Sequence, residues 1–294
     1  MSNKDWITYH DDKGNECFLN TVTGEIDNGV KVEFTMRTGG RYFVVSPEQI
    51  KNESKGKNKH PKRHKGEKFY FMSKDIEYDL IPSDLFKLVY LNSFGRFKDD
   101  IITKNERQPM TVKDLPTVLN ISDRSIRDFL KNVTPDYLII DDDGIIHVKK
   151  ECFCTGKIKG KHWLKVYNLG IKRLFQENTR QSQKEIGYIL LMIQFLNYEY
   201  NVLCHNPHET DMNKIQFMTV QEFCQEIGYD TGKYKRLIDT YGHITIEVDG
   251  KKQKFCSFVI EDSDLRKAKI FVNPNVLYSG SHKSDVEILG AFCK

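Results

Sequence analysis

Apolar residues follow the same helical spacing in two separate stretches of the chain. Residues 111–130 align without gaps with residues 219–238, and the apolar positions are kept nearly throughout although the identity is low. In the first stretch Leu115 and Leu119, with Val118 between them, have the i, i+3, i+4 spacing of one buried helix face. A short polar break and a second amphipathic segment follow in both copies. Each copy is therefore predicted to form a helix-turn-helix.

The residues at the helix ends and in the turn support the same prediction. Thr111 and Thr219 are good N-cap residues, and each has an acid three positions later, which is close to a capping box. The breaks at 120–123 and 228–231 hold turn-forming residues around one apolar side chain. That apolar side chain is expected to fill the corner between the two helices.

The flanks of the two copies also correspond. An apolar helix is predicted upstream of each copy, at 85–94 and 186–200, and a hairpin downstream of each, at 137–148 and 243–259. An Asp-Gly pair between alternating strands is a strong hairpin signal. Helix, helix-turn-helix and hairpin together make a winged helix, so we predict two winged helices in tandem.

Short aromatic segments punctuate the rest of the chain. Four of them are expected to be strands, at 41–46, 69–73, 163–168 and 270–273. The two that precede the winged helices are predicted to pair with the wings. Residues 6–26 predict a hairpin and a further turn. Their layout is similar to a WW domain but lacks its second Trp and its proline-binding aromatic pair, so a small β-meander is the preferred interpretation.

These elements define an α+β protein with two tandem winged-helix domains, a small N-terminal β module and a basic linker. The predicted boundaries are an N-terminal β-rich module at 1–50, a flexible basic linker at 51–68, a first winged helix at 69–164 and a second at 165–294.

Charge is concentrated in the linker. The chain has 294 residues and a net charge of +4, whereas residues 51–68 hold eight Lys or Arg and two acids. This segment has no apolar residue to bury, so we expect a flexible tether. It is either a solvated linker or an arm that contacts phosphates without reading bases. The arm residues would be Lys57, Lys59, Lys62, Arg63 and Lys65.

Several classes of protein are disfavoured. The sequence has no apolar run long enough for a transmembrane helix and no signal-peptide pattern at its start, so we expect a cytoplasmic protein without membrane partners. Seven scattered cysteines without CxxC spacing predict reduced thiols rather than disulfides or a metal site. Phosphate-loop, GxGxxG, HExxH and GxSxG motifs are absent. We expect no enzymatic activity and no cofactor.

Basic residues occupy the positions from which a winged helix contacts DNA. Base contacts would come from the second helix of each helix-turn-helix, and phosphate contacts from the wing. The candidate DNA-binding residues are Arg124, Ser125, Arg127 and Lys131 in the first unit, Lys233, Lys235 and Arg236 on the second helix of the second unit, and Lys251, Lys252 and Lys254 on its wing. The first wing carries an acidic tip at 141–143. The second unit is therefore favoured for direct DNA contact.

The C-terminal segment resembles a known family. Residues 270–280, with Asn273, Pro274 and Gly280, and the closing apolar stretch 288–292 are similar to the end of RepL-type replication proteins of small Gram-positive plasmids. The turn at 23–26 also fits that family. The likeness covers less than half of the chain, and a second winged helix and the basic linker depart from it. It implies initiation of replication at a plasmid or phage origin, with host replication machinery as a partner.

Three functions are compatible with these sequence features. The leading hypothesis is a non-enzymatic initiator that binds double-stranded DNA at a specific origin. A plasmid or phage transcriptional regulator on the same scaffold is the alternative, because a fold does not fix a function. The third is an adaptor whose winged helices bind only proteins. A homodimer is compatible with each of them.

Overall fold

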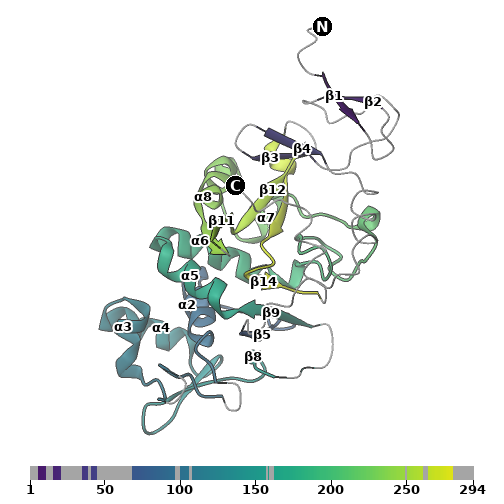
Figure 1. The fold of residues 1–294 in the computed structure, drawn as a ribbon. Coiled ribbons are helices and arrows are strands. Elements are labelled where there is room, and N and C mark those ends of the chain that lie inside the picture. Colours follow the sequence, from purple (N-terminus) through teal and green to yellow (C-terminus); the bar gives the residue numbers. More distant parts are fainter. Residues whose placement is uncertain are drawn as a thin grey trace.

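The computed structural model describes residues 68–280 except 97–99, 106–107, 157, 159–161, 249 and 261–263, together with the backbone of four N-terminal strands. The described residues form an α+β structure of short helices and small antiparallel sheets (Figure 1). Residues 51–67, including all five candidate arm residues of the linker, lie outside the described residues. Within the described ranges, none of the helices combines the length and the apolar character needed to cross a bilayer.

The first repeated unit begins with a strand and a buried helix. Pro82 occupies the first turn of that helix, where its missing N–H costs nothing, so the helix begins before the predicted residue 85. A helix-turn-helix and a hairpin follow as predicted. The elements are β5 (Phe69–Ser73), α2 (Pro82–Asn92), the 3₁₀ turn η1 (Val112–Asp114), α3 (Leu115–Leu119), α4 (Asp123–Val133), β6 (Leu138–Ile140), β7 (Ile146–Val148) and β8 (Phe153–Cys154).

The second unit repeats this order with additions. The predicted helix at 186–200 is shifted, because Thr179 caps α6 and a 3₁₀ turn follows its end at Leu191. The helical elements are α5 (Asn168–Glu177), α6 (Arg180–Leu191), η2 (Ile193–Phe195), η3 (Met212–Lys214), α7 (Val220–Glu226), η4 (Thr231–Lys233), α8 (Tyr234–His243) and η5 (Leu265–Lys267). The strands are β9 (Trp163–Tyr167), β10 (Thr245–Val248), β11 (Lys251–Lys254), β12 (Cys256–Val259), β13 (Lys269–Val272) and β14 (Leu277–Tyr278).

The N-terminal strands form the predicted hairpin and one unexpected pairing. Strands β1 (Trp6–His10) and β2 (Glu16–Asn20) pair antiparallel. Strands β3 (Thr35–Thr38) and β4 (Arg41–Val44) also pair, and β3 continues onto β12 through Met36 opposite Val259. The N-terminal segment therefore extends a sheet of the second unit, β13-β12-β3-β4.

A four-stranded sheet joins the two units with approximate two-fold symmetry. Its strand order is β14-β9-β5-β8, and its central pair places Phe71 opposite Lys165. On one side of this central pair, β8, which follows the hairpin of the first unit, pairs with β5. On the other side, β14, which follows the hairpins of the second unit, pairs with β9. The prediction that β5 and β9 pair with the wings is wrong, because they pair with each other. This pairing joins the two copies edge to edge.

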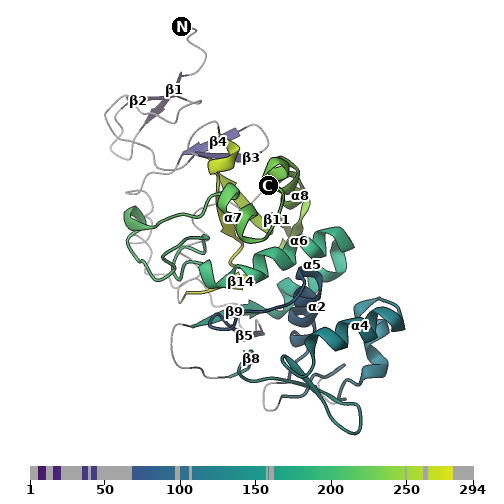
Figure 2. The same ribbon diagram turned by 180° about the vertical axis from the view of Figure 1, so that it is seen from behind.

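The main hydrophobic core lies beside this sheet. Helices α2 and α6 make the most extensive helix–helix contact, and the backbones approach closely where Gly187 meets Pro82. Helix α4 packs on α2, and α8 packs on α6. The helices α2, α4, α5, α6 and α8 therefore lie along one side of the molecule (Figures 1 and 2). A smaller hydrophobic cluster, separate from the main core, includes Val202, Phe271 and Tyr278.

Candidate nucleic-acid interface

The two helix-turn-helix segments share their local geometry. The backbone N–H of Thr111 donates to Asp114 at 2.9 Å, and that of Thr219 donates to Glu222 at 2.7 Å, so both predicted capping boxes are present. After the first helix, Asn120 and Gly228 occupy the same place in the repeat and both have a left-handed backbone, with φ of 51° and 63°. The alignment of the two stretches thus extends to backbone conformation.

The corner of each turn is filled as expected. Ile121 in the first unit and Tyr229 in the second occupy equivalent positions, and both are partly buried against the main core. Each holds the second helix at a fixed angle to the first. The same packing that defines the turn therefore leaves one face of α4 and of α8 pointing away from the core.

Helix α4 presents all of its candidate residues to solvent. Ile126, Phe129 and Val133 are buried on one face. Ser122 caps the helix by accepting a hydrogen bond from the N–H of Ser125 at 3.3 Å. The four candidate residues on the opposite face are exposed, namely Arg124, Ser125, Arg127 and Lys131.

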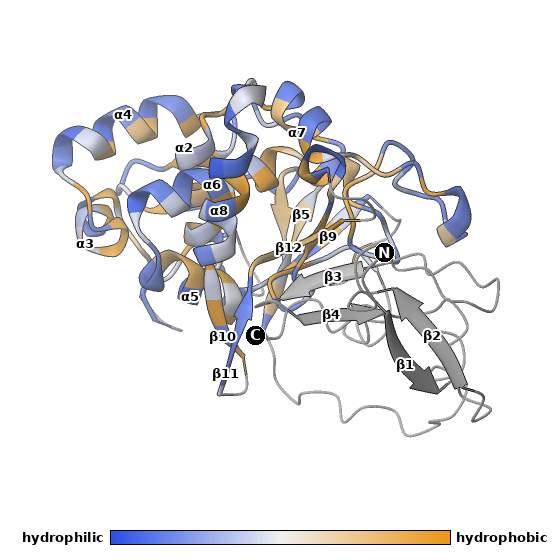
Figure 3. Cartoon of the chain, turned by 90° about the horizontal axis from the view of Figure 1, so that it is seen from above, coloured by the Kyte–Doolittle hydropathy of each residue, from blue (hydrophilic) through white to orange (hydrophobic). Residues whose placement is uncertain are grey.

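Helix α8 has the same division. Leu237 and Tyr241 are buried, and the Tyr241 hydroxyl donates to the backbone carbonyl of Glu185 on α6 at 2.7 Å. The candidate residues Lys233, Lys235 and Arg236 are exposed. Lys233 also pairs with Asp230 at 2.9 Å, and its hydrogen bond holds the pKa of Asp230 below its usual value. In Figure 3 the hydrophilic positions of both helices alternate with hydrophobic ones, as expected of half-buried helices.

In the two units, different hairpins lie against the start of the helix-turn-helix. In the first unit the second hairpin strand lies directly against the segment before the helix-turn-helix, where Val112 N–H donates to Gly144 at 3.1 Å. In the second unit Val220 N–H donates to Ala268 at 2.9 Å, so β13 takes that place instead. The hairpin β10–β11 is an additional one. The interpretation of residues 243–259 as the wing equivalent to 137–148 is therefore corrected.

The basic residues of the second unit are therefore divided between the additional hairpin and the hairpin that corresponds to the first wing. Lys251 and Lys252 are exposed on the β10–β11 hairpin, which packs beside α8, whereas Lys254 is half-buried. The hairpin that corresponds to the first wing by its pairing is β12–β13. The connection between its strands carries Arg266 and Lys267, which are both exposed. These two residues were not predicted from the sequence, because the Asp-Gly turn at 249–250 is the stronger local hairpin signal.

The tip of the first hairpin is built from carboxylates. Asp141 Oδ1 accepts hydrogen bonds from the N–H of Asp143 at 3.1 Å and of Ile145 at 2.8 Å. His147 lies 3.0 Å from the other carboxylate oxygen, and its hydrogen bond lowers the pKa of Asp141. Asp141, Asp142 and Asp143 are all exposed. A cluster of exposed carboxyl groups disfavours contact with phosphates.

A groove of about 720 Å³ separates the first helix-turn-helix from the junction of α5 and α6. Arg180, at the start of α6, donates to the carbonyl of Asn120 at 3.3 Å, and Ser125 of α4 also lines the groove. Arg180 is a candidate phosphate contact between the two units that was not predicted from the sequence. Because it lies outside both repeats, no sequence signal pointed to it.

In the part of the chain that the structure describes, His, Cys, Asp and Glu side chains nowhere gather in groups of three or more that could hold a metal ion. No family model matches the sequence, and neither a curated protein nor a solved structure matches it.

Proposed function

We propose that this chain is a sequence-specific double-stranded DNA-binding protein with two winged-helix units in tandem. The observation that carries the proposal is the repeated helix-turn-helix, in which the cap, the left-handed turn residue and the exposed cationic face of the second helix all recur. An α-helix fits the major groove, and Arg or Lys side chains can bond to guanine O6 and N7 there.

The second unit is the better candidate for base contacts. Helix α8 carries Lys235 and Arg236 on its exposed face, and the β10–β11 hairpin adds Lys251 and Lys252 beside it. Cations on a neighbouring hairpin can bind phosphates while the helix reads bases. The basic linker supplies further positive charge for phosphate contacts.

The approximate two-fold sheet supports contact with two half-sites. Related units that face the same side of a molecule can reach successive major grooves, about one helical turn or roughly 34 Å apart. Because α4 and α8 differ in sequence, the two half-sites would differ as well. Arg180 lies between the units, where the intervening phosphates would pass.

We propose initiation of replication at a plasmid or phage origin as the biological role, which rests on the RepL-like C-terminal segment. In the structure Asn273 of that segment donates to the Lys254 carbonyl at 2.8 Å and so ties it to the β10–β11 hairpin. A plasmid that carries only this gene and its binding sites should then replicate. A change in transcription from a nearby promoter, without replication, would favour a regulator.

The acidic tip at 141–143 favours one additional role. Because it repels phosphates and is exposed, it suits a basic surface of a protein partner, such as host replication machinery. This contact would use a different part of the first unit from the α4 face, so DNA and protein binding are compatible.

The direct test is DNA binding by the full chain, with fragments selected from the genome that encodes it. Replacing both Lys235 and Arg236 by Ala should reduce the preference for the selected fragment over a scrambled duplex, by roughly 10- to 100-fold for each base that α8 no longer recognises. Replacing Lys251 and Lys252 by Ala should weaken binding to both duplexes and flatten its dependence on salt.

Lys214→Ala is the matched control, because Lys214 is exposed on η3, whose Met212 packs on the smaller cluster rather than beside α8. Its affinity should equal that of the wild type. A wild-type affinity without salt dependence, or an equal loss on both duplexes in the α8 variant, would contradict base recognition by α8.

A further inference from the structure

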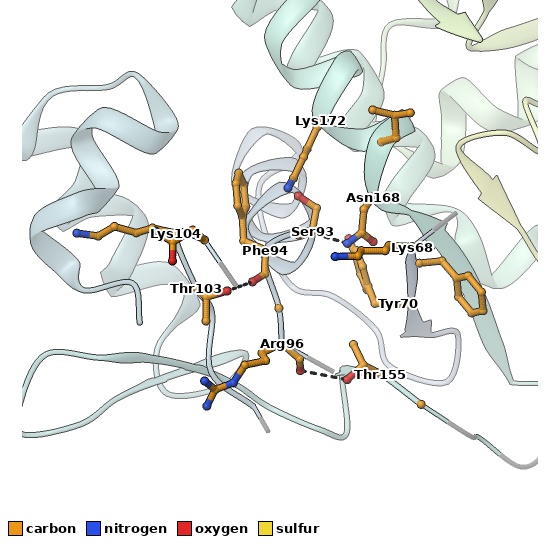
Figure 4. A pocket seen from close by; sticks show the side chains of 15 residues that line it. Lys68, Tyr70, Ser93, Phe94, Arg96, Thr103, Lys104, Thr155, Asn168 and Lys172 are labelled. Atoms are coloured by element: carbon orange, nitrogen blue, oxygen red, sulfur yellow. Dashed lines mark hydrogen bonds between the residues drawn. The ribbon is translucent and has the colours of Figure 1, made fainter. Parts of the chain in front are cut away.

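A second cavity, of about 910 Å³, lies apart from the exposed faces of α4 and α8. Its walls come from the start of β5, the loop after α2, residues 103–105, residues 155–156 and the start of α5 (Figure 4). Pockets for small molecules commonly enclose about 300–1,000 Å³. The cavity is therefore large enough for a ligand of nucleotide size.

Hydrogen bonds fix the loop at the centre of this cavity. Thr103 Oγ1 donates to the carbonyl of Phe94 at 3.1 Å, and Thr155 Oγ1 donates to that of Arg96 at 3.4 Å. Asn168 Nδ2 donates to the Ser93 carbonyl at 2.8 Å. Three separate segments thus hold residues 93–96 in place, so the cavity has a preformed floor.

Aromatic packing fixes the wall between α2 and α5. The rings of Tyr90 and Phe175 stack with their centroids 3.8 Å apart, and Phe94 meets Tyr90 edge to face at 5.2 Å. Lys172 on α5 lies over the Phe94 ring, with Nζ 3.8 Å from its centroid. This cation–π contact places the Lys172 ammonium group at the cavity wall.

The lining is strongly cationic. Lys68, Arg96, Lys104 and Lys172 all contribute to it, and no Asp or Glu is among the described lining residues. Lys104 pairs with Asp114 at 2.5 Å, outside the lining. In Figure 4 the ammonium groups of Lys172 and Lys68 end in the same central region, whereas the side chains of Arg96 and Lys104 point away from them.

The charge of Lys68 acts on the Lys172 ammonium group. Burial lowers the pKa of Lys172, and the charge of Lys68 lowers it further. An anion between the two lysines would oppose both effects, since it would stabilise the charged form of Lys172.

Apolar surface lies next to these cations. Phe69 is 40% exposed and Leu169 is 54% exposed, and both line the cavity. Phe69 is held edge to face by Phe71 and Tyr167, with centroids 5.3 and 5.9 Å away. Bases stack readily on aromatic rings, while phosphates bind Lys and Arg.

We propose that this cavity binds a nucleoside triphosphate, with the phosphates near Lys172 and Lys68 and the base on the apolar side near Phe69. The arrangement is independent of the exposed faces of α4 and α8. It gives the protein a small-molecule site in addition to its proposed DNA interface.

Titration calorimetry of the full chain with ATP tests the proposal, with inorganic tripolyphosphate and adenosine as the separate halves of the ligand. ATP should bind with a Kd below about 1 mM and more tightly than either half. Lys172→Met should weaken ATP binding about tenfold or more. Lys68→Gln is a second variant that leaves the packing of α5 intact, and it should weaken binding in the same direction.

Lys184→Met is the matched control, because Lys184 also lies over an aromatic ring, that of Tyr188 at 5.6 Å, but outside the cavity. This control and the α8 variant with Lys235 and Arg236 replaced should bind ATP as the wild type does. Absence of ATP binding at about 1 mM would overturn the proposal. Unchanged affinity in both cavity variants, or tripolyphosphate binding as tightly as ATP, would overturn it as well.

Discussion

Lys74 is a buried cation that joins the two repeated units. It lies just after β5, is 7% exposed, and its ammonium group donates to the Leu196 carbonyl at 2.6 Å and to Ser279 Oγ at 3.4 Å. Burial lowers its pKa from the usual 10.5 to about 8, although nearby Cys204 and Asp75 oppose this change. No sequence signal pointed to its burial, because a lysine after a strand is ordinarily solvated.

The depressed pKa of Lys74 predicts a pH dependence of stability. Above about pH 8 the folded protein releases the proton, whereas the unfolded chain keeps it until about pH 10.5. In that window the unfolded state binds more protons, so stability rises with pH. The free energy of unfolding of the wild type, minus that of Lys74→Met, should increase by on the order of 1 kcal/mol between about pH 7 and 9.

Urea unfolding at several pH values measures this difference. The same comparison with Lys184→Met, which removes an exposed lysine, should give a constant difference over the range. A constant difference for Lys74→Met as well would show that its pKa is not depressed in the folded state.

At the scale of elements, the features that could be predicted from the sequence are those set by neighbouring residues. The caps at Thr111 and Thr219, the turns and the first hairpin follow from nearest-neighbour chemistry, and the structure confirms them. The pairing of β5 with β9, and the position of β13 beside Val220, could not be predicted. Both join segments that are far apart in the chain. The alternation of side chains along a strand specifies which face is buried but not which strand lies next to it.

Two glycines with different surroundings predict opposite effects of the same substitution. A Cβ at Gly187 would overlap the backbone carbonyl of Pro82, and neither backbone can yield without moving its helix. Gly187→Ala should therefore destabilise the protein by roughly 1–3 kcal/mol despite the better helix propensity of Ala.

Gly242 on α8 has no atom within 4 Å of an added Cβ. Gly242→Ala should leave stability unchanged or raise it by up to about 1 kcal/mol. Thermal unfolding of both variants makes the comparison. Equal melting temperatures would contradict the close approach of α6 to α2.

At the scale of the whole molecule, the two units form an internal pair. The sheet β14-β9-β5-β8 and the α2–α6 contact lie at its centre, and α4 and α8 lie outside them. The sequence repeat predicted that there are two units but not how they meet. The cavity beside Lys172 could not be predicted either, because its walls come from five segments that only the fold brings together.

Hydroxyl-radical footprinting of the full chain on its selected DNA fragment tests the central claim most directly. The account predicts two protected segments about one helical turn apart. Replacing Arg124 and Arg127 by Ala should weaken one segment, and replacing Lys235 and Arg236 should weaken the other. A single protected segment that responds only to one pair of substitutions, or no protection at all, would contradict a DNA-binding protein built from two duplicated units.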